Sequence, residues 1–253
     1  MKRHLTFALA ALLLAACQTT PAVAPSPTTP VAATPQPTYA PLVVNDAFIG
    51  GPPPAASHGQ QWDVQQEQLA PGEDTARIEQ ASRDQGANQR PDPFEEFQPV
   101  FGANFTQEHL PATAALFAAV GARVGAATGP AKQRYARPRP FTANQAWRCT
   151  PALDDQIRNA LGPNLSYPSG HSTLGYAWAL VLTQIMPDQA QPLMERGFQY
   201  GRSRVICGAH WTSDVNAGRV LAGAVVAQLN GMDSFQAQLA AARAELRTAG
   251  YAH

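Results

Sequence analysis

The sequence predicts a single all-α domain that follows a signal peptide and a long tether. Three observations predict this fold class. From about residue 60 apolar residues recur at helical spacing, no alternating stretch is long enough to build a sheet, and Gly-Pro and Asn-Gly pairs separate the helical segments. With 45% hydrophobic and 14% charged residues, the 253-residue chain can form one ordinary core plus accessory segments.

An export signal and a lipidation site are predicted at the N-terminus. Residues 1–4 are basic, and Leu5 to Ala16 form an apolar run of twelve residues, too short to span a bilayer comfortably. The run ends in Leu14-Ala15-Ala16-Cys17, which resembles the bacterial lipobox, where the cysteine is acylated and becomes the first mature residue. The alternative is ordinary cleavage at Ala22-Val23-Ala24. Gln18 replaces the Asp that often retains such lipoproteins in the inner membrane, so an outer-membrane location is expected.

Residues 18–60 are predicted to form a disordered tether rich in Pro, Ala and Thr. Such a composition cannot bury enough apolar surface to offset the entropy of ordering. The folded domain is therefore expected over residues 61–253. The formal net charge of zero argues against a nucleic-acid partner, because contacts with several phosphates need a basic surplus on one face.

Eight helices are predicted within this domain. They are expected at Trp62–Leu69, Glu73–Gln85, Glu108–Thr128, Pro151–Leu161, Ser169–Ile185, Gln189–Val205, Trp211–Leu229 and Ser234–Ala249. We expect Gly129-Pro130 to end the third helix, Gly162-Pro163 the fourth and Asn230-Gly231 the seventh. After Leu14, no apolar run reaches about 18 residues without Arg, Gln or Asp, so no membrane-spanning helix is predicted.

Two cysteines, Cys149 and Cys207, remain once the lipobox cysteine is set aside. In an oxidising compartment an even pair is expected to form a disulfide, which would add on the order of 2–4 kcal/mol of stability. The alternative is two buried thiols that never meet.

The first of three short motifs runs from Lys132 through Arg139 to Pro140. The chain has sixteen Arg and two Lys, and Lys2 lies in the predicted signal, so Lys132 would be the only lysine of the mature chain. A genome that favours Arg explains the scarcity without any function. Yet a compact ammonium and a guanidinium fork are not interchangeable in a cation-rich motif, so we expect a functional role for Lys132.

The second motif, Pro168-Ser169-Gly170-His171, precedes an apolar run from Leu174 to Leu182. Ser169 is a natural N-cap for the helix that this run predicts, and the free N–H groups of Ser169, Gly170 and His171 would be able to face an anion. A glycine at position 170 lets the backbone approach a ligand closely. The alternative is a plain helix cap with an incidental histidine.

In the third motif, His210 and Asp214 are four residues apart, so the carboxylate is expected to reach the imidazole. A carboxylate bound to one ring nitrogen leaves the other as a nucleophile. Arg204, six residues upstream, is expected to bring a guanidinium fork to phosphate oxygens. The alternatives are a helix-surface hydrogen bond and a metal site built from His171, His210 and Asp214. The cations in the three motifs disfavour a metal, because they would repel it and attract a phosphate.

Together, Lys132-x6-Arg139-Pro140, Pro168-Ser169-Gly170-His171 and Ser203-Arg204-x5-His210-x3-Asp214 resemble the complete signature of the type 2 phosphatidic acid phosphatase superfamily. The text around the second and third motifs is most similar to the soluble bacterial class A non-specific acid phosphatases. The similarity extends from about Phe48 to the C-terminus. It implies a single-domain helical bundle of the acid phosphatase and vanadium haloperoxidase type.

The resemblance also implies a role for each motif residue. The phosphoryl oxygens would be bound by Lys132, Arg139, Ser169, Gly170 and Arg204. His210 would attack phosphorus to form a phosphohistidine, with Asp214 orienting it. His171 would protonate the leaving group and then activate water. Neither a cofactor nor a metal is implied. Arg134 and Arg137 lie in the first motif but outside its signature positions, so they are expected at the surface or behind the site.

The expected function is therefore metal-independent hydrolysis of small phosphate monoesters with broad specificity. We expect inhibition by vanadate and an exported protein that contacts the membrane by its lipid anchor only. The resemblance also implies a homodimer. Three alternatives stay open. They are a vanadium-dependent haloperoxidase, a lipid phosphate or pyrophosphate phosphatase, and an envelope lipoprotein that binds phosphate without turning it over.

Overall fold

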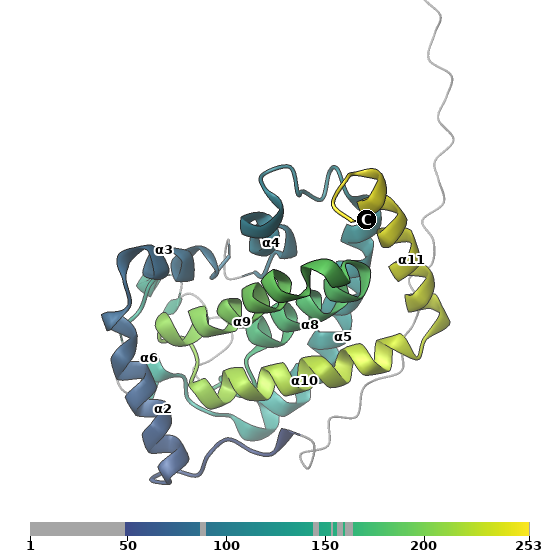
Figure 1. The fold of residues 1–253 in the computed structure, drawn as a ribbon. Helices are drawn as coiled ribbons and strands as arrows, with labels where there is room; N and C mark the ends of the chain where they lie inside the picture. The colour runs from purple at the N-terminus through teal and green to yellow at the C-terminus, as the bar shows by residue number, and fades with distance from the viewer. Residues whose placement is uncertain are drawn as a thin grey trace, which may run out of the picture. The chain divides into compact units, whose positions relative to one another are not determined.

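The computed structural model describes residues 49–86, 90–143, 147–152, 154–155, 159 and 164–252. Over these residues every regular element is a helix and no strand occurs, which confirms the all-α fold class (Figure 1). The predicted signal peptide, its lipobox cysteine and the tether up to residue 48 lie outside the described residues. Much of the predicted helix Pro151–Leu161 does so as well.

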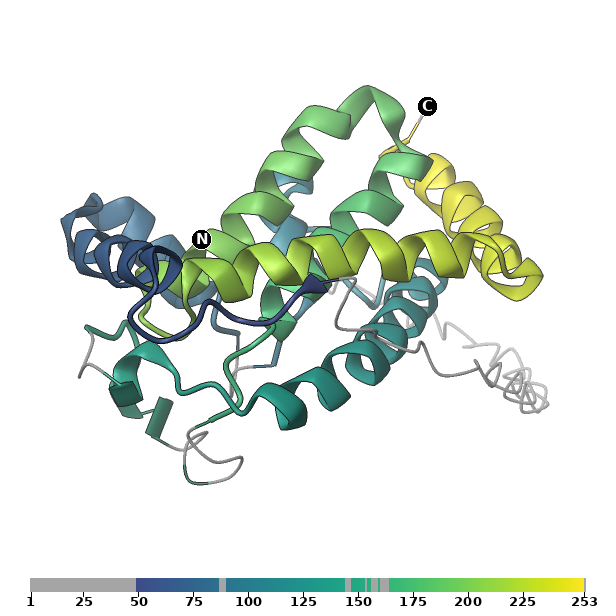
Figure 2. The same ribbon diagram turned by 90° about the horizontal axis from the view of Figure 1, so that it is seen from below.

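Three long helices form the centre of the fold. They are α8 (Gly170–Ile185), α9 (Ala190–Ile206) and α10 (Thr212–Asn230). A short 3-10 turn, η3 (Pro187–Gln189), joins α8 to α9, so the two helices run in opposite directions and pack along their length. Helix α10 packs against both (Figures 1 and 2).

The remaining helices surround this centre. Helix α5 (Pro111–Tyr135) packs on α8 and carries α11 (Asp233–Thr248) on its outer side. Helices α3 (Thr75–Arg83) and α4 (Pro93–Phe101) pack on α9, whereas α2 (His58–Leu69) packs on α10. The short elements η1 (Ala70–Gly72) and α6 (Pro140–Ala143) complete the described part. Figure 1 shows α2 and α3 at the end of the fold opposite to α11.

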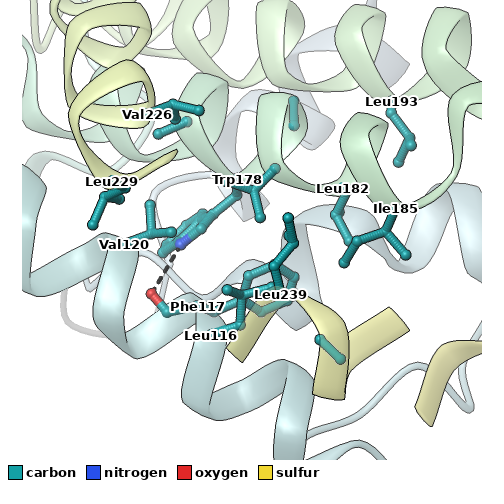
Figure 3. Packing of buried hydrophobic residues seen from close by; sticks show 14 of the residues in the cluster. Leu116, Phe117, Val120, Trp178, Leu182, Ile185, Leu193, Val226, Leu229 and Leu239 are labelled. Atoms are coloured by element: carbon teal, nitrogen blue, oxygen red, sulfur yellow. Dashed lines mark hydrogen bonds between the residues drawn. The ribbon is translucent and has the colours of Figure 1, made fainter. Parts of the chain in front are cut away.

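The apolar core lies between α5, α8, α10 and α11 (Figure 3). Phe117 and Val120 of α5 meet Trp178 of α8 there, and the indole N–H of Trp178 donates to the backbone oxygen of Phe117 at 3.2 Å. Burying a large apolar side chain contributes roughly 1.5–3 kcal/mol, so this cluster fixes α5 against α8. The polar motifs lie at the other end of these two helices.

The predicted bounds of α8 to α11 agree with the structure within one residue at each end. The expected stop at Gly129-Pro130 is wrong, because α5 continues through both residues to Tyr135. Proline removes one backbone hydrogen bond from a helix, yet Ala131 is buried beyond it, and the ammonium of Lys132 is held by two backbone oxygens. These contacts stabilise the last turns despite the proline.

Helix α4 was not predicted, because Pro93 and Pro99 both read as helix breakers. Pro93 stands in the first turn, where no backbone N–H is needed, and Asp92 caps the helix by accepting from the N–H of Phe94 at 2.8 Å. Helix α2 begins at His58, four residues before its predicted start, because Ser57 caps it by accepting from the N–H of Gln60 at 3.2 Å.

One helical stretch of the described residues, Pro111–Ala143, is long and apolar enough to cross a membrane by length and composition. Half of its most apolar window is buried inside the fold. The core helix of a folded domain has the same properties, and Phe117 and Val120 on this stretch belong to the core. The stretch is therefore weak evidence for a membrane span.

Candidate active site

The three motifs meet at one end of the α5, α8 and α9 bundle. Lys132 is on the last turn of α5, and Arg139 follows that helix. Ser169 caps the N-terminus of α8, with Gly170 and His171 as its first two residues. Arg204 is on the last turn of α9, and His210 and Asp214 bracket the start of α10. All of the signature residues predicted from the sequence thus come from helix ends that converge.

His210 precedes α10 rather than lying on it, and Asp214 is the third residue of that helix. The imidazole Nδ1 lies 3.4 Å from Asp214 Oδ2. The same carboxylate oxygen accepts from the N–H of Trp211 at 2.9 Å and from the hydroxyl of Ser166 at 2.5 Å. The four-residue spacing therefore brings the carboxylate to the imidazole, as predicted, although through a helix cap rather than a helix face.

Arg139 determines which nitrogen of His210 carries the proton. Its Nη1 donates to the backbone oxygen of Ala209 at 2.8 Å and lies 3.0 Å from His210 Nε2. A guanidinium only donates hydrogen bonds, so Nε2 must accept, and the ring proton must be on Nδ1 facing Asp214. Burial, and then the cations Arg139 and Lys132, hold the pKa of His210 well below its usual range. His210 is therefore a neutral imidazole whose Nε2 has a lone pair.

Lys132, which is half-buried, and Arg204, which is buried, bring two further cations to this imidazole. The ammonium of Lys132 donates to the backbone oxygens of Leu165 at 2.8 Å and Pro168 at 2.6 Å. Burial and the neighbouring Arg139 lower the pKa of Lys132 to about 7. The same two causes lower the pKa of Arg204, which is 1% exposed, to about 10.

Burial is the main cause of these lowered pKa values, and for Lys132 and Arg204 repulsion by the neighbouring Arg139 is the second cause. Asp154 and Asp214 offset the repulsion only in part, because each raises the pKa of the cations near it without restoring the usual value. A bound oxyanion would supply the negative charge that is missing. The cluster is therefore electrostatically suited to a phosphoryl group.

Ser169 is a helix cap, as predicted: its Oγ accepts from the N–H of Ser172 at 3.3 Å. Its own backbone N–H donates to the backbone oxygen of Asp214 at 3.0 Å. The expectation that this N–H faces an anion is therefore wrong. At Gly170 an added Cβ would have only Lys132 Cε near it, at 4.0 Å, so the backbone here is open toward the cations.

His171 is the second residue of α8 and contacts residues that precede α4 and that lie on α9. Its Nε2 is 3.3 Å from the backbone oxygen of Gln85, and its ring stacks on Tyr200 with centroids 6.0 Å apart. Burial, then Arg204 and then His210 hold its pKa well below the usual range. The imidazole of His171 is therefore neutral, and its Nε2–H points toward the backbone oxygen of Gln85.

Among the described residues no group of three or more His, Cys, Asp and Glu side chains is arranged to hold a metal ion, and His171, His210 and Asp214 do not form such a group. A tetrahedral or trigonal-bipyramidal oxyanion is the ligand that the surrounding cations fit.

Comparison with known proteins agrees with this geometry. A family model described as the PAP2 superfamily matches residues 111–233, the span that contains all three motifs. Over this span, which is just under half of the chain, the sequence is similar to the PAP2 superfamily. It is 42% identical over 151 residues to a non-specific acid phosphatase from Salmonella typhimurium and 40% identical over 150 residues to one from Providencia stuartii, with 59% of each chain covered.

An acid phosphatase from Zymomonas mobilis is 42% identical over 121 residues, which cover 48% of this chain and 44% of that relative. The chain thus matches about three fifths of the length of the Salmonella and Providencia relatives. The PAP2 superfamily match confirms the resemblance inferred from the motifs.

Arg137 was expected at the surface or behind the site, and it is buried behind the site, with Nη1 2.6 Å from Asp214 Oδ1. Its position two residues before Arg139 was the only available signal. The sequence analysis missed Ser166 and Asp63, which also support the site, because neither belongs to one of the three motifs.

The site is tied to the chain segment around residue 149 by a disulfide between Cys149 and Cys207, whose Cα atoms are 4.7 Å apart. Cys207 caps the C-terminus of α9, three residues after Arg204. The bridge therefore anchors the end of the helix that supplies one of the site's cations.

Proposed function

We propose that this protein is a metal-independent acid phosphatase that hydrolyses small phosphate monoesters through a phosphohistidine at His210. One observation carries the proposal: buried cations surround a neutral imidazole that a carboxylate orients. A protein that only binds phosphate needs the cations but not an oriented nucleophile. The printed names of the relatives, which are acid phosphatases, support the same activity.

In the first half of the reaction, Nε2 of His210 attacks phosphorus and the bond to the leaving oxygen breaks. Charge on the phosphoryl oxygens is stabilised by Lys132, Arg139 and Arg204 and by the Gly170 amide, which are fixed before the substrate arrives. His171 gives its proton to the leaving oxygen. The products of this half are an alcohol and the phosphohistidine.

In the second half, water attacks the phosphohistidine. His171, now neutral, takes a proton from the water, the bond between phosphorus and Nε2 breaks, and His210 returns to its neutral form. Asp214 holds the Nδ1 proton of His210 in place, and its own position is fixed because Ser166 and Trp211 also donate to it.

The site requires His210 to be neutral and His171 to be protonated in the first half. The low pKa of His171 comes in part from Arg204. The negative charge of a bound phosphate opposes that effect and raises the pKa of His171, so protonation accompanies binding. Because acidic solution favours this protonation, we expect an acidic optimum and a bell-shaped rate profile.

A decisive experiment measures release of 4-nitrophenol from 4-nitrophenyl phosphate by the chain from residue 18 in excess EDTA. We expect turnover in EDTA, loss of at least about a thousandfold with His210→Ala, and a radiolabelled, acid-labile adduct at His210 in wild type. The control is His109→Gln, an exposed histidine outside the motifs, which should retain activity. Dependence on an added divalent metal, or normal turnover by His210→Ala, would contradict the proposal.

The same proposal places the enzyme outside the cytoplasm, held at a membrane by a lipid on Cys17. Support comes from the lipobox-like sequence and from the Cys149–Cys207 bridge, because disulfides persist in oxidising compartments. Labelling of expressing cells with radioactive palmitate tests it. Wild type should incorporate label and Cys17→Ser should not; equal labelling of the two would contradict the anchor.

A further inference from the structure

We propose that Arg137 is a positioning residue for His210 and acts through Asp214, and that Asp63 of α2 holds Arg137 in place. The inference deepens the proposed function and rests on it, because it assigns the support of the attacking imidazole. It also assigns α2, which begins within the last three residues of the predicted tether, a part in catalysis.

The guanidinium of Arg137 lies between two buried carboxylates. Its Nη1 donates to Asp214 Oδ1 at 2.6 Å, and its Nη2 donates to Asp63 Oδ2 at 2.8 Å. The side chains of the three residues are 6%, 0% and 1% exposed, so these contacts are shielded from water. A guanidinium that is shielded from water fixes both the position and the orientation of the carboxylates that it bridges.

Two polar side chains complete the support of Arg137. Ser213 accepts from Arg137 Nη1 at 2.7 Å, and Gln60 accepts from Nη2 at 2.7 Å. Ser213 in turn donates to Asp63, through its N–H at 2.8 Å and its hydroxyl at 2.5 Å. Residues of α2 and of the first turn of α10 thus fix the same guanidinium from two sides.

This support determines how Asp214 meets His210. Oδ1 of Asp214 is held by Arg137, which leaves Oδ2 facing His210 Nδ1 at 3.4 Å. Without Arg137, Oδ1 would lose this donor, and the carboxylate plane would be held only through Oδ2, by the N–H of Trp211 and the hydroxyl of Ser166. The guanidinium of Arg137 also forms an ion pair with this carboxylate on the side away from the imidazole.

The alternative is that the network only holds α2 against α10 and has no role in positioning His210. The two hypotheses predict different effects of substitutions in the network on the pKa of His210. The charged or titratable groups that face His210 are Lys132 of α5, Arg139 after α5, His171 of α8, Arg204 of α9 and Asp214 of α10. Arg137 and Asp63 lie behind Asp214 and carry opposite charges, so their removal should shift the pKa of His210 in opposite directions.

The test uses the acid limb of kcat/KM, which reports the protonation of His210 in the free enzyme. Arg137→Met removes a positive charge, stabilises the imidazolium and should move the acid limb to higher pH. Asp63→Asn removes a negative charge and should move it to lower pH. Each shift should be on the order of half to one pH unit. All variants are assayed with 4-nitrophenyl phosphate. Ionisation of the substrate then affects every rate profile equally and does not contribute to the differences between variants.

Two variants control for charge and for folding. Arg134→Gln removes an arginine from an exposed position three residues earlier and should leave both kcat and the acid limb unchanged. Arg137→Lys keeps the charge but not the fork, so it should keep the acid limb and lower kcat roughly tenfold with little change in KM.

If Arg137→Met does not fold, Ser213→Ala removes one contact to Arg137 without changing any charge, and it should lower kcat severalfold with KM unchanged. Acid limbs of Arg137→Met and Asp63→Asn that coincide with wild type, or an unchanged kcat for Ser213→Ala, would overturn the inference. A wild-type enzyme that forms no phosphohistidine would instead overturn the proposed function, so the two failures are distinguishable.

Discussion

Arg139 Nη1 lies 3.0 Å from Nε2 of His210, the atom proposed to attack phosphorus. The guanidinium of Arg139 therefore covers the lone pair of His210 Nε2. An incoming phosphoryl group offers oxygens that accept this donor more strongly, because they are charged. Arg139 is thus placed to transfer from the nucleophile to the substrate, which exposes Nε2 only when a phosphoryl group is present.

Replacing Arg139 by Met should separate these two roles. We expect kcat/KM to fall roughly 10²–10³-fold, since one preorganised charge donor is lost. We also expect the pKa of His210 to rise, because Arg139 is the largest of the charged neighbours that lower it. The acid limb of the rate profile should then move to higher pH. A fall in activity with an unmoved acid limb would show that Arg139 does not act on His210.

Lys132 should make anion binding depend on pH above neutrality. Its pKa is lowered to about 7, so the ammonium that attracts an oxyanion is lost as the pH rises through that value. Sulfate is a suitable probe because its own charge is constant over this range. As a competitive inhibitor, sulfate should weaken by up to about tenfold per pH unit above pH 7 in wild type.

The matched variant is Lys132→Met, which has no ammonium to lose. It should bind sulfate more weakly than wild type at pH 6 and show a smaller change between pH 6 and pH 8. A slope equal to that of wild type would assign the titration to a different group.

Gly170 and Gly218 should respond differently to alanine. An added Cβ at Gly170 would approach only Lys132 Cε, at 4.0 Å, whereas at Gly218 it would lie 2.8 Å from the backbone oxygen of Ser169. Gly218→Ala should therefore destabilise the fold by about 1–3 kcal/mol through overpacking. Gly170→Ala should unfold at nearly the wild-type temperature but lose activity, because its methyl group projects toward the cations. Thermal unfolding and kcat/KM measured together check both outcomes.

The residues that form the site were easier to predict from the sequence than the residues that hold them in place. Lys132, Arg139, Arg204 and the two motif histidines carry recognisable chemistry, so their meeting was expected before their positions were known. Arg137 pairs with Asp63 and Asp214, which are 74 and 77 residues away, and no local pattern links such partners.

The helix boundaries show the same limit. The buried faces of α8 to α11 repeat regularly, so their bounds follow from periodicity. Helix α5 passes through Gly129-Pro130 because tertiary contacts of Ala131 and Lys132 stabilise its last turns. Helix α4 tolerates Pro93 at its first position. Local propensity alone gives the wrong answer in both places.

Glu96 of α4 should lower the stability of the fold as the pH rises. Its carboxyl group is 1% exposed, and neither oxygen has a hydrogen-bond partner among the described residues. Burial raises its pKa well above the usual range, and the unfolded chain has the usual value. The folded state therefore holds a proton that the unfolded state releases, so the free energy of unfolding decreases as the pH rises from about 4.5 toward the folded pKa.

Replacing this group with a neutral isostere removes the effect. Glu96→Gln should raise the free energy of unfolding in urea by at least about 1 kcal/mol at pH 8 relative to its effect at pH 4. Glu95→Gln is the matched control, because that carboxylate is exposed and adjacent in sequence, and it should change little at either pH. If the effect of Glu96→Gln is the same at both pH values, Glu96 does not hold a proton in the folded state.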